Sequence, residues 1–156
     1  MPSYLSFARF YDGLMQDACY EKRCGYILEL AEKFRHDMGI TLDLACGTGT
    51  LTRLLKKRGV DVFGIDYSME MLSEAMQSAS EEGLDILFLR QKMQSIDLYG
   101  TINTCVCTLD SINHLTKIED VAKTFDRVGL FMDDDGLFIF DVNTVYKHKN
   151  VLADNT

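Results

Sequence analysis

The 156-residue chain has few basic side chains: 16 Lys and Arg stand against 24 Asp and Glu, for a formal net charge of −8. This balance would repel a polyanionic partner, so it disfavours binding to nucleic acid or to an anionic membrane surface. The chain also lacks any apolar run near the roughly 18–20 residues that cross a bilayer, and its amino terminus has no basic region followed by an apolar stretch. We therefore expect a cytoplasmic protein without nucleic-acid or membrane partners.

The cysteine content does not suit a disulfide scaffold. The five cysteines, at positions 19, 24, 46, 105 and 107, are odd in number and lie mostly inside apolar runs, which fits a reducing compartment. Alternation along a strand sends Cys105 and Cys107 to the same face, and no second Cys or His pair stands at the spacing of metal ligands. We expect both thiols to pack in the core, and we expect no metal site.

Short apolar strands alternate with helical patterns, and this alternation is typical of parallel βαβ units in an α/β fold. The predicted strands are Ile40–Cys46, Val60–Ile65, Ile86–Arg90, Ile102–Leu109 and Gly136–Val142. The predicted helices are a looser one within 1–18, then Tyr20–Arg35, Thr50–Arg58, one from a Ser68 N-cap to Gly83, and Glu119–Phe131. The acidic run Asp133–Gly136 is predicted to be a solvated turn before the fifth strand.

The most informative motif joins a strand to a helix through a glycine turn, Leu42-Asp43-Leu44-Ala45-Cys46-Gly47-Thr48-Gly49-Thr50. Such a turn needs glycine because its dihedral angles are unusual and because a Cβ would keep a ligand off the main chain. Asp66 ends the next strand, where a carboxylate can accept hydrogen bonds from both hydroxyls of a ribose. The pattern favours an adenosine-containing ligand over the alternative, a purely structural turn with Asp66 on the surface.

The residue at position 52 helps to choose between adenosine ligands. A dinucleotide site would favour a third glycine there, which permits close helix–strand packing and brings a pyrophosphate to the helix N-terminus. Position 52 is threonine. S-adenosylmethionine, which needs no phosphate cradle, therefore fits the pattern better than NAD(P).

Four segments resemble one family. Asp43–Gly49 resembles the first motif of class I S-adenosylmethionine-dependent methyltransferases, and Gly64–Leu72 (Gly-Ile-Asp-Tyr-Ser-Met-Glu-Met-Leu) resembles their second. Phe7–Tyr26 is similar to the amino-terminal cap of a bacterial branch that acts on small molecules, and Thr108–Leu115 is similar to that branch's loop after strand four. The resemblance implies a single domain over residues 1–156, with cap helices at 1–36 and a Rossmann-like core at 37–156. The implied sheet is doubly wound and parallel, with strand order 3-2-1-4-5.

The resemblance also assigns residues to the cofactor, S-adenosylmethionine, whose product is S-adenosylhomocysteine. The aspartate at position 66 would hold the ribose, the glycine turn would face the methionine part, and tyrosines of the cap would close over the site. The implied cofactor-binding residues are Tyr11, Tyr20, Asp43, Ala45, Cys46, Gly47, Gly49, Asp66, Tyr67, Met71, Met93, Gln94 and Leu109.

Three features depart from the family pattern. Lys92 stands where many relatives have an acidic residue that accepts from the adenine amino group. Ala45 replaces the first glycine of the fuller glycine pattern, a substitution expected to cost little. The family's sheet has seven strands and the last two are absent from this sequence, so Leu137–Phe140 would form a hydrophobic edge. We expect the chain to be the first part of a longer fold, or else to form a homodimer through Leu137–Val142.

The implied reaction is transfer of a methyl group from S-adenosylmethionine to a nucleophilic atom of a small molecule. Because the sulfonium already activates the methyl group, the protein mainly has to align donor and acceptor and exclude water. A protonated amine or a hydroxyl acceptor also needs a base, and Asp110 and His114 are the candidates. Two other classes stay open: an NAD(P)-dependent oxidoreductase and a non-catalytic S-adenosylmethionine-binding domain.

Overall fold

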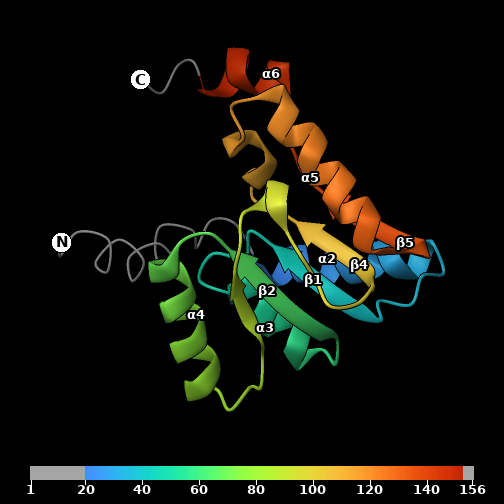
Figure 1. Ribbon diagram of the computed structural model, residues 1–156, viewed down its shortest axis with the longest axis vertical. Helices are drawn as coiled ribbons and strands as arrows, with labels where there is room; N and C mark the ends of the chain where they lie inside the picture. The colour runs from blue at the N-terminus through green and yellow to red at the C-terminus, as the bar shows by residue number, and fades with distance from the viewer. Residues whose placement is uncertain (1–19, 153–156) are drawn as a thin grey trace.

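The computed structural model describes residues 20–152 (Figure 1), so Tyr11 and the helix expected within 1–18 lie outside the described residues. The strands are β1 (Ile40–Leu44), β2 (Asp61–Asp66), β3 (Phe88–Arg90), β4 (Ile102–Cys107) and β5 (Met132–Phe140). They pair in parallel, in the order β3-β2-β1-β4-β5. The predicted fold class and strand order are therefore confirmed. The division into a cap at 1–36 and a core at 37–156 stays a prediction.

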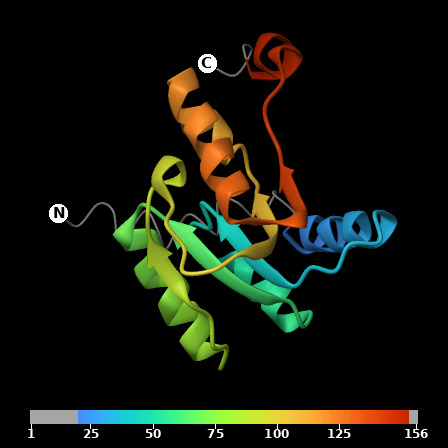
Figure 2. The same cartoon turned by 45° about the vertical axis from the view of Figure 1, so that its right-hand side comes forward.

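Helices cover the sheet on both faces (Figure 2). The main helices are α2 (Tyr20–Lys33), α3 (Thr50–Lys57), α4 (Met69–Glu81) and α5 (Ile118–Phe131). Short helical turns follow β3, β4 and β5, namely η2 (Met93–Ser95), η3 (Ser111–His114), α6 (Val145–Lys147) and η4 (His148–Leu152). Ser68 caps α4 as predicted, because its hydroxyl oxygen accepts from the Met71 backbone N–H at 3.2 Å.

Two apolar clusters make the core, one on each face of the sheet. The cluster that joins α2 and α3 to the sheet contains Cys24, Ile27, Leu51, Leu55, Val60, Val62 and Val106. The cluster that joins α5 to the sheet contains Leu42, Leu44, Ile65, Ile96, Ile102, Cys105, Cys107, Ile112 and Val128. Val106 thus lies in one cluster while its neighbours Cys105 and Cys107 lie in the other. This confirms that both thiols share one face of β4 and pack in the core.

The fifth strand begins earlier than predicted. We expected a solvated turn at Asp133–Gly136, but β5 already starts at Met132 and includes these residues, so that prediction is wrong. The register against β4 is irregular there, with Ile102 opposite Met132 and then Thr104 opposite Leu137. β5 therefore carries extra residues at this point. The side-chain amide of Asn103 donates to the Asp133 carboxylate at 2.8 Å and holds the acidic run beside β4.

β5 forms one edge of the described sheet. Its Phe138 and Phe140 make an aromatic cluster with Phe125 of α5, with ring centroids 5.1–5.3 Å apart. Phe140 stays 41% exposed. Association through Leu137–Val142 stays a prediction.

Within residues 20–152, none of the helices combines the length and the apolar character that a membrane span requires.

Candidate active site

The glycine turn lies at the carboxyl end of β1, between that strand and α3. Gly47 and Gly49 have φ values of 57° and 73°, which are the left-handed conformations that glycine tolerates. A Cβ on Gly49 would also lie 3.0 Å from the Ala75 Cβ and from the Phe88 ring, so this glycine permits close packing of α4 and β3. Ala45 is left-handed too, with φ 60°. That conformation costs an L-residue about 1–2 kcal/mol, which is more than the small cost expected for this substitution.

Asp66, the last residue of β2, joins its strand to the glycine turn. One carboxylate oxygen accepts from the Gly47 backbone N–H at 2.9 Å, and the other accepts from the Ser68 backbone N–H at 2.8 Å. These bonds place the carboxylate beside the turn and at the start of α4. A carboxylate has about four lone-pair sites, so each oxygen can accept one more hydrogen bond.

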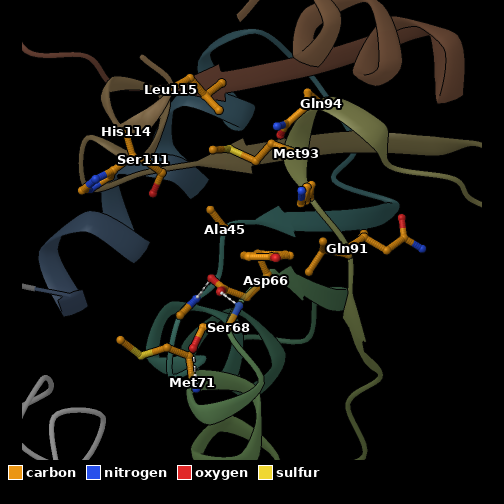
Figure 3. Close-up of a pocket in the computed structure, with 14 residues that line it drawn as sticks. Ala45, Asp66, Ser68, Met71, Gln91, Met93, Gln94, Ser111, His114 and Leu115 are labelled. Carbon is orange, nitrogen blue, oxygen red and sulfur yellow. Dashed lines mark hydrogen bonds between the residues drawn. The ribbon is translucent and has the colours of Figure 1, made fainter. Parts of the chain in front are cut away.

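A cavity of about 580 Å³ opens at this edge of the sheet. Figure 3 shows Asp66 and Ser68 on one side of it, Met93 and Gln94 across from them, and Ser111, His114 and Leu115 on a third side. The lining residues are Ala45, Gly47, Ile65, Asp66, Tyr67, Ser68, Met71, Gln91, Lys92, Met93, Gln94, Ser111, His114 and Leu115. We call this space the main cavity.

A narrow recess of about 30 Å³ adjoins the main cavity and shares Ala45, Gly47 and Ser111 with its lining. Its other lining residues are Tyr20, Asp43, Cys46, Leu51, Thr108 and Leu109. A recess of this size holds one water-sized group. Tyr20 comes from α2, and Thr108 and Leu109 come from the loop after β4, so both segments contribute to the lining of the recess.

Asp43 is the buried carboxylate of the recess, with only 2% of its surface exposed. The Thr52 hydroxyl donates to it at 2.7 Å. Burial raises the pKa of Asp43 to about 7, the Thr52 hydroxyl opposes the shift, and the nearby Asp66 charge adds to it. Near neutral pH this site can therefore exchange a proton or meet a cation.

Cys46 lies next to this carboxylate in the turn. Burial, together with the negative charges of Asp43 and Asp66, raises the pKa of the Cys46 thiol well above its ordinary value. The thiol therefore stays protonated and is a poor nucleophile.

Tyr67 projects from the end of β2 and is 57% exposed. Lys92 Nζ lies 5.0 Å from the centroid of its ring, and the Arg90 guanidinium carbon lies 5.4 Å from it. Arg90 also donates to the Tyr67 carbonyl at 3.1 Å. These two cations hold the ring at the rim of the main cavity by cation–π attraction.

The loop after β4 carries the two candidate bases. His114 lines the main cavity together with Ser111. Asp110 is not among the residues that line either cavity, and its carboxylate lies 3.4 Å from Lys147 Nζ. The structure therefore brings His114 to the main cavity and pairs Asp110 with a lysine.

The predicted residues divide between the two cavities. Those that line the main cavity are Ala45, Gly47, Asp66, Tyr67, Met71, Met93, Gln94 and His114. Those that line only the recess are Tyr20, Asp43, Cys46 and Leu109. Gly49 lines neither, and Tyr11 is outside the described residues. Whether each residue contacts a ligand stays a prediction.

Sequence reasoning missed Ile65, Ser68, Gln91, Ser111 and Leu115 of the main cavity, and Leu51 and Thr108 of the recess. Ser68 had a signal, because the N-cap of α4 directly follows the Asp66 end of β2. Gln91 also had a signal, because it directly follows β3 and leads into the loop that carries Met93. Ser111 and Leu115 also had a signal, because both belong to Thr108–Leu115, the segment that resembles the family's loop after strand four.

The chain is similar to known proteins in sequence and in fold. The profile of the methyltransferase-domain family matches residues 41–136, which span β1 through the start of β5 and include the glycine turn and Asp66. The chain belongs to this methyltransferase family. The putative methyltransferase YqeM of Bacillus subtilis is 40% identical over 155 residues, a match that covers 98% of this chain and 60% of YqeM.

A solved S-adenosylmethionine-dependent methyltransferase from Clostridium acetobutylicum is similar to this chain with a TM-score of 0.85. It is 34% identical, and the match covers 96% of this chain and 61% of that protein. A glycine/sarcosine N-methyltransferase of Halorhodospira halochloris is 29% identical over 102 residues, which cover 64% of this chain and 38% of the relative. The chain thus spans about 60% of the length of YqeM and of the Clostridium acetobutylicum protein.

Proposed function

We propose that this methyltransferase chain binds S-adenosylmethionine at the carboxyl edge of the sheet and transfers its methyl group to a small molecule. The observation that carries the proposal is the Asp66 carboxylate, which is fixed against the glycine turn and has free lone pairs at the main cavity. A carboxylate at this point can accept from the two hydroxyls of a ribose.

The residues present fit the parts of such a cofactor. Met71 and Tyr67 on one side, and Met93 on the other, offer polarizable and apolar faces to a flat base. Lys92 is a hydrogen-bond donor only, so it cannot accept from an adenine amino group as an acidic residue can. In this proposal the adenine is therefore held by the side-chain faces of Met71, Tyr67 and Met93, and not by a carboxylate that accepts from its amino group.

The recess fits the charged end of the cofactor. Its volume of about 30 Å³ suits a single ammonium group, and Asp43 provides a buried carboxylate beside it. Ala45 and Gly47 line both spaces, so a ligand can run along the turn from the main cavity into the recess. The relative from Clostridium acetobutylicum, which is S-adenosylmethionine-dependent, supports this choice of cofactor.

When bound, the cofactor supplies a methyl group that is already activated by a positive sulfur. The chain's contribution is then to fix the donor and to orient an acceptor on the side of Ser111 and His114. If the acceptor loses a proton, His114 is the better placed of the two candidate bases, because Asp110 lines neither cavity.

The acceptor in this proposal is a small molecule. The relative from Halorhodospira halochloris methylates glycine and sarcosine, as its name states, which favours a small acceptor. The net charge of −8 opposes nucleic acid as the acceptor.

Calorimetry on the native chain tests the proposal. We expect S-adenosylmethionine and S-adenosylhomocysteine to bind, and NAD not to bind at the same concentrations. Tight binding of NAD alone would favour the oxidoreductase class and would overturn the proposal. A methyl-transfer assay over amines and hydroxy compounds then separates an enzyme from a non-catalytic binding domain, which would bind the cofactor without turnover of any acceptor.

A further inference from the structure

Asp141 holds the loop after β4, although it belongs to the segment after β5. One oxygen of its carboxylate accepts from the Leu109 backbone N–H at 3.0 Å, and the other accepts from the Asp110 backbone N–H at 2.7 Å. Two consecutive backbone N–H groups thus point at one carboxylate. Such a concave pair is a typical binding site for an anion, and here a side chain of the same protein fills it.

The two residues that Asp141 holds have an uncommon backbone conformation. Leu109 and Asp110 have φ values of 60° and 57°, in the left-handed region that disfavours residues with a Cβ. A strained pair of this kind persists only when its surroundings hold it. The carboxylate of Asp141 provides the contact that holds both N–H groups at once.

The same carboxylate is tied to α2. Nη1 of Arg23 in that helix lies 2.6 Å from Oδ2 of Asp141, and the side chains of the two residues are 28% and 33% exposed. α2 also carries Tyr20, which lines the recess, and Leu109 of the loop lines it too. Asp141 therefore connects two segments that line the recess, α2 through Arg23 and the loop after β4 through its backbone N–H groups.

We infer that Arg23 and Asp141 form a positioning pair that sets the shape of the recess, and thereby the affinity for the amino-acid end of the cofactor. This inference rests on the proposed function. Neither residue lines either cavity, so the pair acts through Tyr20 and Leu109 and not by contact with the ligand. The nucleoside end of the cofactor lies in the main cavity, away from Arg23 and Asp141, so the pair does not change the affinity for that end.

Two ligands separate the two ends of the site. S-adenosylhomocysteine carries the amino-acid tail, and 5′-methylthioadenosine has the same nucleoside and sulfur without the tail. In Asp141→Asn an amide replaces one acceptor oxygen and the negative charge is lost. We expect affinity for S-adenosylhomocysteine to fall about tenfold, the scale of one lost charge-assisted hydrogen bond, with affinity for 5′-methylthioadenosine unchanged.

Arg23→Gln is the second variant, because it leaves both loop hydrogen bonds in place and keeps the test open if Asp141→Asn does not fold. We expect Arg23→Gln to weaken the affinity for S-adenosylhomocysteine roughly two- to fivefold, which is the scale of a part-exposed ion pair. Arg23→Lys should restore most of this affinity. Glu21→Gln is the matched control. It removes a different ion pair of α2, that of Glu21 with Arg58 at 3.0 Å, and should change neither affinity.

The outcomes distinguish the inference from the proposed function. Equal affinity of the native chain and both variants for S-adenosylhomocysteine, with unchanged thermal unfolding, overturns the inference alone. Equal losses for both ligands also overturn it, because the pair would then act on the whole site. Failure of the native chain to bind either ligand overturns the proposed function itself.

Discussion

The Thr52 hydroxyl donates to the buried carboxylate of Asp43 at 2.7 Å, at the helix position where a dinucleotide-binding turn has its third glycine. Both residues are almost fully buried, and Thr52 has no exposed surface. The threonine thus has a function in this fold that a glycine does not provide. It stabilises the negative charge of a carboxylate that lines the recess proposed for the cofactor's ammonium group.

Thr52→Val should destabilise the fold more at pH 8 than at pH 5. Valine has nearly the same shape but donates no hydrogen bond, so it leaves the ionised Asp43 without its donor. The expected loss in the free energy of unfolding is about 1–3 kcal/mol at pH 8, where the carboxylate is ionised. Urea unfolding at the two pH values measures it, with Thr101→Val at an exposed loop position as the control. An equal loss at both pH values would contradict the charge assignment.

Asp43 should make stability fall as pH rises from about 4 to about 7. Its folded pKa of about 7 lies above its ordinary value of 3.8, so the folded state binds more protons than the unfolded state in this window. Asp43→Asn removes this dependence. As the pH rises from 5 to 8, we expect the free energy of unfolding of the variant to increase by about 2–4 kcal/mol relative to that of the native chain.

Chemical unfolding across the pH range checks this prediction. Asp61→Asn, at the exposed start of β2, is the control for the loss of one negative charge. Parallel stability profiles for the native chain and Asp43→Asn would show that the carboxylate is not perturbed in the folded state.

Binding of S-adenosylhomocysteine near pH 6.5 should release protons. An ammonium group in the recess favours the ionised form of Asp43, so the pKa of this carboxyl falls when the ligand binds. Calorimetry in two buffers with different heats of ionisation measures the release, and Asp43→Asn should show much less of it. Equal binding heats in both buffers would argue that no cation meets Asp43.

Ala45→Gly should stabilise the fold. Ala45 has a φ of 60°, where alanine is strained and glycine is not. The gain from relieved strain is offset in part by the greater freedom of glycine in the unfolded chain, so we expect a net gain of about 0.5–1 kcal/mol. Thermal unfolding measures it, and Ala122→Gly within α5 is the opposite case, since glycine there should destabilise the helix. A loss of stability in Ala45→Gly would mean that the alanine methyl group makes contacts worth more than the strain.

The sheet was predictable because its strands are covered on both faces, which leaves apolar runs that the sequence displays directly. The glycine turn and Asp66 were predictable for a related reason, since the turn and the strand end lie at fixed places in a βαβ unit. The strand order came from the resemblance to methyltransferases. The start of β5 was not predictable, because Asp133–Gly136 has the composition of a turn and is held in the strand by Asn103 of another strand.

The loop after β4 shows a second limit. Leu109 was predicted as the last residue of the fourth strand, yet the left-handed conformation of Leu109 and Asp110 is held by Asp141, which follows the next strand. Ser111 and Leu115 reach the main cavity only because this loop turns there. A pattern of neighbouring residues does not contain such a long-range contact.

The most direct test of the account is calorimetry with S-adenosylhomocysteine on the native chain and on Asp66→Asn, with Asp61→Asn of the same strand as the control. The account predicts a ten- to hundredfold weaker affinity for Asp66→Asn, since losing a charge-assisted hydrogen bond costs about 1.5–3 kcal/mol, and no change for the control. An Asp66→Asn variant that is folded and binds S-adenosylhomocysteine as tightly as the native chain would contradict the account.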